Sequence, residues 1–362
     1  MRYERKNRVK KVAIYTIQTN NYGNRLQNYA VQEVCNKLGY EAVSLGNSDP
    51  TRGLIVLKKF PFLVNAIKTT RNLVRSIIKN DATCKFYKFN QYIKYSTDYI
   101  SNESYRISNY YAILVGSDQV WNTQFKWISE NAFLPFYHPK KISFAASFGV
   151  DHIEKSDKIA ACLNNFSALS VREEAGREII KELTGKNATV IVDPTLLLSQ
   201  QEWRKIERKP KGAEKGYILT YFLSSMNEKA KNLLEKEKGN YRICNLLDKN
   251  DLIAGKAGPS EFLWLFDNAD LILTDSFHAS VFSFLFNKPF VVFDRNWSEG
   301  NMNSRLVTLL SKLGLERKYA GSGMSNDIWE HDYAQSYKRL ETEQKKALNF
   351  LKAALEAEQG EI

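Results

Sequence analysis

The stretch PSEFLWLFDNADLILTDSFHASVFSFLFNKPFVVFDR, residues 259–295, predicts a helix, a strand, a second helix and a second strand in that order. Pro259 suits the first turn of a helix, and the apolar run 271–273 suits a strand that is buried on both faces. Ser276 is a typical amino-terminal cap for the next helix, and the strand 290–293 follows that helix. The stretch therefore predicts one α/β repeat.

His278 lies in the first turn of the second predicted helix, beside the carboxyl end of the strand 271–273. Open α/β sheets bind ligands at this edge, and free backbone N–H groups at the start of a helix attract anions. We therefore take His278 as a candidate catalytic residue and Ser276 as a candidate binding residue for an anion. A simpler interpretation stays open, in which His278 only caps the helix.

The same alternation of strands and helices continues through the rest of the chain, which predicts an α/β fold with parallel sheets. A polar turn and a helix from about residue 24 to 38 follow the first strand, and the turn lacks the GxGxxG pattern of a dinucleotide site. The strands outside 259–295 are predicted at 11–16, 41–45, 110–115, 141–145, 168–171, 189–192, 217–222 and 241–245.

Two domains are predicted from the chain length and from one change in composition. The chain has 362 residues, enough for two domains of ordinary size. Residues 199–216 are lysine-rich and contain proline and glycine, as linkers often do. We expect an amino-terminal domain over residues 1–193, a carboxyl-terminal domain over residues 200–320, and a helix at 327–358 that crosses back toward the first domain.

The composition indicates a soluble globular protein, with 43% hydrophobic and 25% charged residues. No apolar run reaches the ~18 residues that a membrane-spanning helix needs, and the run after the basic amino terminus is too short for a signal peptide. The four cysteines are far apart, which predicts reduced thiols in a cytoplasmic protein. No His/Cys cluster has metal-ligand spacing, so we expect neither a metal nor a cofactor.

The excess positive charge is concentrated in residues 51–100, which hold ten Lys or Arg and two Asp or Glu, or +8 of the net +12. Residues 54–80 alternate apolar and basic residues at helical spacing, and an aromatic, basic helix is predicted for 84–100. The alternatives are a solvated helix face and a peripheral contact with an anionic membrane at the inner face. In the second case, the aromatic residues Phe60, Phe62, Phe86 and Tyr87 reach the lipid headgroups.

Two polar clusters follow predicted strands of the amino-terminal half, at the edge where α/β sheets bind ligands, and the second cluster favours binding of a sugar. The first follows the strand 11–16 and contains Asn24, Arg25 and Gln27. Turn formation and helix capping explain the asparagine better than ligand binding does, but they explain Arg25 and Gln27 less well. The second follows the strand 110–115 and contains Asp118, Gln119 and Trp121. Its carboxylate and amide suit sugar hydroxyl groups, and its indole suits the apolar face of a sugar ring. The alternative for this cluster is an Asx turn with a core tryptophan.

Arg172 follows the strand 168–171 and is a further candidate binding residue. It precedes a helix, where the helix dipole disfavours a cation. An anionic ligand or a carboxylate partner explains it better than helix capping does.

With these motifs in order, the sequence resembles the polysaccharide pyruvyl transferase family. The resemblance spans residues 11–295. The matching segments are NYGNRLQNYA (21–30), VGSDQVWN (115–122), SVRE (170–173), VDPTLLL (192–198) and TDSFHASVFSFLFNKPFVV (274–292). The resemblance implies two Rossmann-like domains that face each other across a cleft, the GT-B architecture. It also implies phosphoenolpyruvate as donor and a pair of sugar hydroxyl groups of a lipid-linked oligosaccharide as acceptor, which becomes a pyruvate ketal in surface polysaccharide biosynthesis. The amino-terminal turn and residues 116–122 match the acceptor side of the family.

The resemblance also implies roles for individual residues. Arg172 matches the donor-binding arginine of the family, His278 its catalytic histidine, and Arg295 falls near a basic residue of the family. Many members have Arg-Leu-His where this chain has Ser276-Phe277-His278. Arg295, Arg25 or Lys288 is then expected to replace the missing cation.

The chemistry of the donor agrees with these roles. Phosphoenolpyruvate carries a carboxylate and a phosphate, which arginines bind in bidentate pairs. A residue of near-neutral pKa, His278, can protonate the vinyl carbon, and Asp118 can accept the proton of an acceptor hydroxyl group. No redox cofactor and no nucleic acid are implied.

Two other functions remain open at this level. A GT-B glycosyltransferase that uses a nucleotide sugar would share the fold, and Asp275 or Asp294 would then hold the ribose. A glycan-binding relative without activity is the other alternative, and the replacement of arginine by Ser276 supports it.

Overall fold

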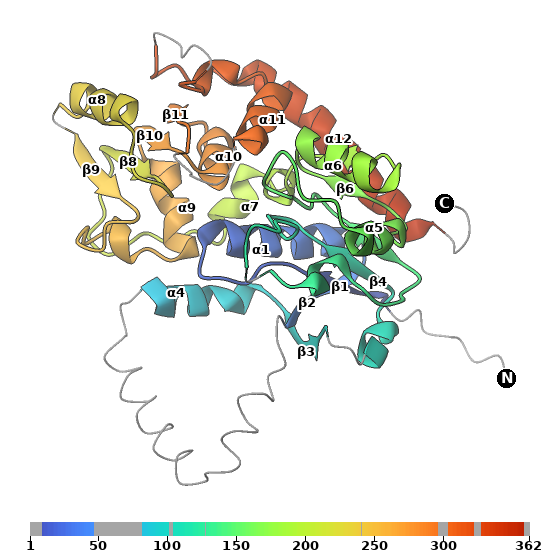
Figure 1. Cartoon of the computed structure of the whole chain (residues 1–362). Coiled ribbons are helices and arrows are strands. Elements are labelled where there is room, and N and C mark those ends of the chain that lie inside the picture. The colour runs from blue at the N-terminus through green and yellow to red at the C-terminus, as the bar shows by residue number, and fades with distance from the viewer. Residues whose placement is uncertain are drawn as a thin grey trace.

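The computed structural model describes residues 9–46, 82–100, 104–126, 128–239, 241–295, 303–321 and 327–357. Two parallel sheets, of five and four strands, organise this part of the chain, and helices separate and cover them (Figure 1). The predicted fold class is confirmed: the protein is α/β, with two Rossmann-like parallel sheets in a GT-B-like arrangement. The predicted domain boundaries at 193 and 200 stay a prediction.

The five-stranded sheet has the strand order of a Rossmann fold, β3-β2-β1-β4-β5. Helix α1 (Tyr22–Lys37) connects β1 to β2, and the side chain of Asn21 caps its amino terminus. The order reverses between β1 and β4, and ligands bind at such a switch point. The strands are β1 (Lys11–Tyr15), β2 (Glu41–Gly46), β3 (Tyr95–Tyr99), β4 (Ala112–Val115) and β5 (Lys141–Ser143). Two short strands, β6 (Ser170–Val171) and β7 (Thr189–Val190), pair beside β5.

The four-stranded sheet has the order β11-β10-β8-β9. Its order reverses between β8 and β10, so this sheet also has a switch point at the carboxyl ends of its central strands. Residues 259–295 form α9, β10, α10 and β11, as predicted. The elements are β8 (Tyr217–Tyr221), α8 (Glu228–Glu237), β9 (Arg242–Asn245), α9 (Pro259–Asn268), β10 (Leu271–Thr274), α10 (Phe277–Leu285) and β11 (Phe290–Val292).

A continuous apolar core joins the two sheets. Helix α1 lies between the first sheet and α9, and the rings of Tyr22 and Phe262 stack with their centroids 4.7 Å apart (Figure 1). Trp203 packs edge-on against Phe282 of α10 in the same core. The remaining helices are α4 (Ala82–Phe89), α5 (Asp157–Asn164), α6 (Glu174–Thr184), α7 (Gln200–Arg204) and α11 (Ser304–Leu313).

The long helix α12 (Ala334–Glu356) touches both halves of the molecule. Near its start, the hydroxyl group of Tyr337 donates to the carbonyl of Phe284 in α10 (2.9 Å). Near its end, the hydroxyl group of Tyr111 donates to the carbonyl of Leu355 (2.7 Å), beside the first sheet. None of the helices in the described ranges carries an apolar run sufficient to span a lipid bilayer.

The expected helix at 84–100 is wrong over its second half. Helix α4 ends at Phe89, and Tyr95–Tyr99 forms β3, the edge strand of the first sheet. Ser44 of β2 donates its backbone N–H to the carbonyl of Lys94, and this pairing outweighs the local pattern. The predicted helix at 54–80 lies outside the described residues.

Candidate active site

A cavity of about 180 Å³ lies where the carboxyl ends of the central strands of the two sheets meet. Asn24 follows β1 and Asp118 follows β4, so both come from the first switch point. Leu223 follows β8 and His278 follows β10, so both come from the second. The two switch points therefore form one site, and this is the place where α/β sheets bind ligands.

His278 enters this cavity from the first turn of α10 and is only 7% exposed. Ser276 caps the helix by accepting the N–H of Ala279 (3.5 Å). The imidazole lies against Gly23 of α1, where an added Cβ would be 2.1 Å from Nδ1. Nε2 is 3.9 Å from Oδ2 of Asp193 and has no hydrogen bond to any described residue. Burial lowers the pKa of His278, and the carboxylates of Asp193 and Asp118 oppose that shift.

Hydrogen bonds from its own turn and from the segment after β1 hold Asp118 in the cavity. Its backbone is in the left-handed region, with φ at 70°, and the N–H of Gln119 donates to Oδ1 (2.8 Å). The side-chain amide of Asn24 donates to Oδ2. Burial would raise the pKa of Asp118, but the charges of Arg172, His278 and Arg305 lower it to about 2. Such a carboxylate stays ionised at neutral pH and is a weak base, so it is better suited to orienting a hydroxyl group.

Arg172 lies beneath the cavity and does not line it. Its guanidinium is completely buried, with Nη2 3.2 Å from Oδ1 of Asp118 and Nη1 2.8 Å from Oδ2 of Asp193. The ring of Phe277 lies 4.3 Å from its central carbon. Of the two explanations for Arg172, the structure therefore shows the carboxylate partner. A direct role in donor binding stays a prediction.

Asp193 is a residue of this network that sequence reasoning treated only as part of a boundary. It accepts hydrogen bonds from Ser117 Oγ (2.6 Å), from Arg172, and from the N–H and hydroxyl groups of Thr195. Burial raises its pKa, but the charges of His278 and Arg172 lower the pKa below the ordinary value. An aspartate before proline reads locally as a turn, so only the fold reveals that it faces His278.

Two further arginines line the cavity beside His278, Arg295 and Arg305. Arg295 follows β11; its Nη2 donates to the carbonyl of Asp275 (3.3 Å), and its Nε lies 3.8 Å from the carboxylate of Asp275. Arg305 is the second residue of α11 and was not singled out from the sequence. Like Arg172, it lies where a helix dipole disfavours a cation, but this is evident only once the structure places the start of α11 at Ser304.

Of the other predicted site residues, Ser276 and Gln119 line the cavity. Trp121 does not: it is fully buried, its indole N–H donates to the carbonyl of Ala132 (2.9 Å), and Phe133 stacks on it. Its predicted stacking on a sugar is therefore wrong, and the alternative of a core tryptophan holds. Gln27 is also fully buried, where its side chain joins Thr16 to the N–H of Ser117.

Arg25 and Lys288 cannot supply the cation that Ser276 leaves missing. Arg25 points toward β3, where its Nη1 donates to the hydroxyl group of Tyr95 (3.2 Å). Lys288 lies just before β11, at the amino-terminal edge of the second sheet, whereas the cavity is at the carboxyl-terminal edge. The expectation of a binding role at these two positions is therefore wrong, and Arg295 is the predicted replacement that lies in the cavity.

The carboxylates that a nucleotide-sugar enzyme would use for the ribose are occupied here. Asp275 is fully buried and accepts the N–H groups of Leu223 (2.6 Å) and Ser224 (2.9 Å). Asp294 accepts hydrogen bonds from Asn303 (3.0 Å) and from the hydroxyl group of Tyr319. Both carboxylates hold loops together, and neither lines the cavity.

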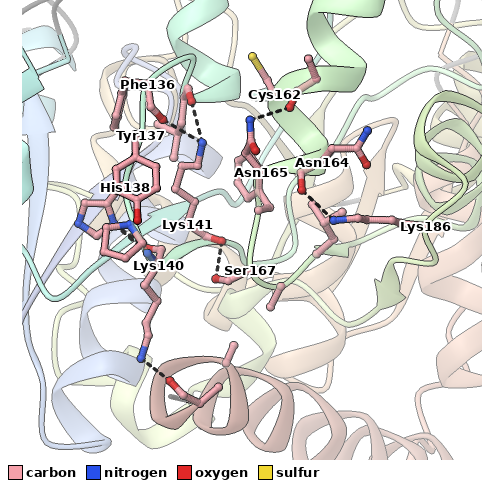
Figure 2. A pocket seen from close by; sticks show the side chains of 18 of the residues that line it. Phe136, Tyr137, His138, Lys140, Lys141, Cys162, Asn164, Asn165, Ser167 and Lys186 are labelled. Atoms are coloured by element: carbon pink, nitrogen blue, oxygen red, sulfur yellow. Dashed lines mark hydrogen bonds between the residues drawn. The ribbon is translucent and has the colours of Figure 1, made fainter. Parts of the chain in front are cut away.

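A second, larger cavity of about 1330 Å³ lies at the amino-terminal edge of the first sheet (Figure 2). Its lysines are engaged with the protein itself. Lys140 donates to the carbonyl groups of Leu355 (2.7 Å) and Ala357 (2.8 Å) at the end of α12. Lys141 donates to those of Leu134 (3.2 Å) and Phe136 (3.0 Å) (Figure 2). This edge therefore anchors α12, and we place the active site in the first cavity.

The sequence pattern of the family described as polysaccharide pyruvyl transferase matches residues 21–296, most of the chain. The chain belongs to this family. The match begins one residue before α1 and ends one residue after Arg295, so it includes the described residues that line the cavity except Ile17, Thr19 and Arg305. Membership places the protein among transferases that act on polysaccharides.

Comparison with solved structures found similar folds at low sequence identity. A protein assigned as a UDP-N-acetylglucosamine 2-epimerase from Listeria monocytogenes has a TM-score of 0.48 at 11% identity, covering 98% of this chain and 99% of that one. The epimerase of Neisseria meningitidis bound to UDP-GlcNAc has a TM-score of 0.44 at 13% identity, covering 94% of each chain. MurG of Acinetobacter baumannii has a TM-score of 0.38 at 8% identity, covering 95% and 98%. A comparison with curated proteins found no match. Similarity this low decides nothing about substrate.

Proposed function

We propose that the protein transfers pyruvate from phosphoenolpyruvate to a pair of sugar hydroxyl groups as a ketal, in the biosynthesis of a surface polysaccharide. The observation that carries the proposal is the composition of the cavity, in a chain of this family. One histidine, two arginines and one ionised aspartate line the same space. Arginines suit a donor with a carboxylate and a phosphate, and the aspartate suits hydroxyl groups.

The reaction requires a proton on the vinyl carbon of the donor, and His278 supplies it. The first sugar hydroxyl group then adds to the central carbon and returns its proton to the imidazole. The imidazolium protonates the bridging oxygen, and phosphate leaves with the electrons of the C–O bond. The second hydroxyl group closes the ring and its proton restores the imidazolium. One proton ends on the new methyl group and one on the phosphate, so charge and atoms balance.

The donor itself favours the protonated form of His278. In the free protein, burial lowers the pKa of the imidazole, so the neutral form predominates at neutral pH. The donor brings about three negative charges into the cavity, and opposite charges nearby raise the pKa of a histidine. His278 is therefore charged mainly when the donor is bound.

The first sheet supplies the acceptor side. Asp118 and Asn24 form one hydrogen-bonded unit, and Gln119 lies beside them in the cavity. We assign Asp118 to orienting a sugar hydroxyl group, because a carboxylate with a pKa of about 2 holds protons weakly. His278 then serves as both the acid and the base. We also propose that the reaction needs neither a metal nor a cofactor.

The test is incubation of the protein with phosphoenolpyruvate and lipid-linked or free sugar acceptors. We expect phosphate release and a matching mass gain of the acceptor by mass spectrometry. His278→Ala should lower turnover by roughly 10²–10⁴-fold while leaving donor affinity within a few-fold. Phosphoenolpyruvate should raise the melting temperature where UDP does not. Stabilisation by UDP with no phosphate release would refute the proposal and favour a nucleotide-sugar enzyme.

We also propose that the protein acts at the inner face of the membrane on a lipid-linked acceptor. The support is the excess of ten basic over two acidic residues in 51–100, since each Lys or Arg near an anionic surface contributes about 1 kcal/mol. Most of this segment lies outside the described residues. Phe86 cannot reach the headgroups as expected, because it is buried against Tyr22, whereas Tyr87 is exposed.

Sedimentation with anionic liposomes tests the membrane contact. Binding should weaken with salt, because the attraction is screened charge. Reversal of Lys58, Lys59, Lys68 and Arg71 to Glu should weaken it too. Protein that stays in the supernatant at low salt would show that the segment is a solvated face, and a free sugar would then be the acceptor.

A further inference from the structure

We propose that Arg305 is an anion-binding residue of the cavity, and that it seats a phosphate group together with Arg295 and the first-turn amides of α10. The proposal deepens the function above, because the phosphate of the donor, and then the released phosphate, would occupy this seat. The phosphate site itself is inferred from Arg305, Arg295 and the start of α10, independently of the donor.

The guanidinium of Arg305 is buried and makes no ion pair with a carboxylate of the described residues. The residue is only 4% exposed, and its Nε has no hydrogen-bond partner. Within the described part of the chain, no carboxylate lies within 4.0 Å of it, whereas Arg172 contacts Asp118, Asp193 and Glu173 within that limit. Burying a cation without an ion-pair partner costs free energy. A bound anion would supply the missing partner.

The location of Arg305 increases that cost. It is the second residue of α11, where the helix dipole disfavours a cation. Burial, and then the charges of Arg172 and Arg295, lower its pKa to about 9, because they outweigh the opposing charges of Glu173 and Asp118. The side chain lines the cavity that contains His278 and Arg295, so an anion in that cavity reaches both arginines.

The start of α10 adds backbone donors to the same space. Ser276 uses its hydroxyl group to cap the N–H of Ala279, the third residue of the helix. The N–H groups of Phe277 and His278 make no hydrogen bond within the described residues, and both residues line the cavity. Free amides at a helix start bind phosphate and carboxylate oxygens.

A phosphate group fits this set of donors better than a single carboxylate does. The two guanidinium groups and the two backbone amides together offer more N–H donors than the two oxygens of a carboxylate can accept. A phosphate monoester offers three terminal oxygens and about two negative charges. Asp118 lines the same cavity as an acceptor only, which suits hydroxyl groups and repels the anion. The donor is thereby oriented with its phosphate toward Arg305.

The experiment measures binding of inorganic phosphate to the whole protein by calorimetry. We compare Arg305→Gln and Arg305→Lys with Arg317→Gln, because Arg317 is exposed just after α11 and serves as a matched control. Arg305→Gln should weaken phosphate binding at least tenfold, Arg305→Lys should weaken it less, and the control should bind as the unchanged protein does. Without phosphate, Arg305→Gln should melt at the same or a higher temperature, because it removes an uncompensated charge.

Several outcomes would overturn the inference. They are unchanged phosphate affinity in Arg305→Gln, a lower melting temperature or failure to fold in that variant, and no phosphate binding by the unchanged protein. Phosphate binding that depends on Arg305 without any pyruvyl transfer would overturn the proposed function alone. Pyruvyl transfer by Arg305→Gln with an unchanged donor KM would overturn this inference alone.

Discussion

Replacement of Gly23 by alanine should act on the protein through His278. A Cβ at residue 23 would lie 2.1 Å from Nδ1, 2.5 Å from Cε1 and 2.7 Å from Cγ of the imidazole. Contacts this short do not persist, so the ring must move away from α1. The ring must move by at least about 1.3 Å to bring Nδ1 from 2.1 Å to an ordinary contact distance, and a misplacement of about 1 Å already costs about 10²-fold in rate.

The expected change in stability is smaller than the change in rate. Alanine favours a helix over glycine by about 1 kcal/mol, and overpacking costs about 1–3 kcal/mol. The free energy of unfolding should therefore fall by only about 1 kcal/mol, whereas a 10²-fold loss of turnover corresponds to about 2.7 kcal/mol. The rate of phosphate release from phosphoenolpyruvate measures the loss of turnover, and urea denaturation measures the change in the free energy of unfolding.

A double-mutant cycle with His278→Ala decides whether the ring carries the effect. Once the imidazole is absent, the methyl group at residue 23 no longer meets the three ring atoms. Gly23→Ala should then cost neither stability nor residual activity in that background. Equal losses in both backgrounds would refute the reasoning, because the methyl group would be acting on something other than His278.

Three further predictions follow from buried groups. Arg172→Ala should lower the free energy of unfolding by about 3–5 kcal/mol in urea denaturation, because it leaves the buried carboxylates of Asp118 and Asp193 unpaired; a change in donor KM at unchanged stability would contradict this. Burial lowers the pKa of His278 below the unfolded value of about 6.5. As the pH falls, the unfolded chain therefore binds a proton at this residue before the folded protein does, and the free energy of unfolding should fall below about pH 6.5. His278→Gln should reduce that pH dependence. Trp121→Phe should lower stability by about 1–3 kcal/mol without changing the acceptor KM; a raised KM would restore Trp121 to the site.

Local patterns along the chain determined the elements of the fold. Pro259 and Ser276 mark two helix starts, and the buried apolar run between them is β10, at the residues expected. The order of elements implied parallel sheets, and the carboxyl ends of strands placed Asn24, Asp118 and His278 on ligand edges. These inferences succeed because helix capping and burial on both faces are read from neighbours in sequence.

The tertiary structure alone decided which of these residues share a site. Trp121 and Asp118 are neighbours in sequence, but one is in the core and the other in the cavity, since the turn after β4 directs them apart. Tyr95–Tyr99 became a strand because β2 offered an unpaired edge. Arg305 lies outside the matching motifs, and the packing of α11 places it in the site. Contacts between distant segments set burial, and burial determines which charges are paired, so no local pattern could predict these outcomes.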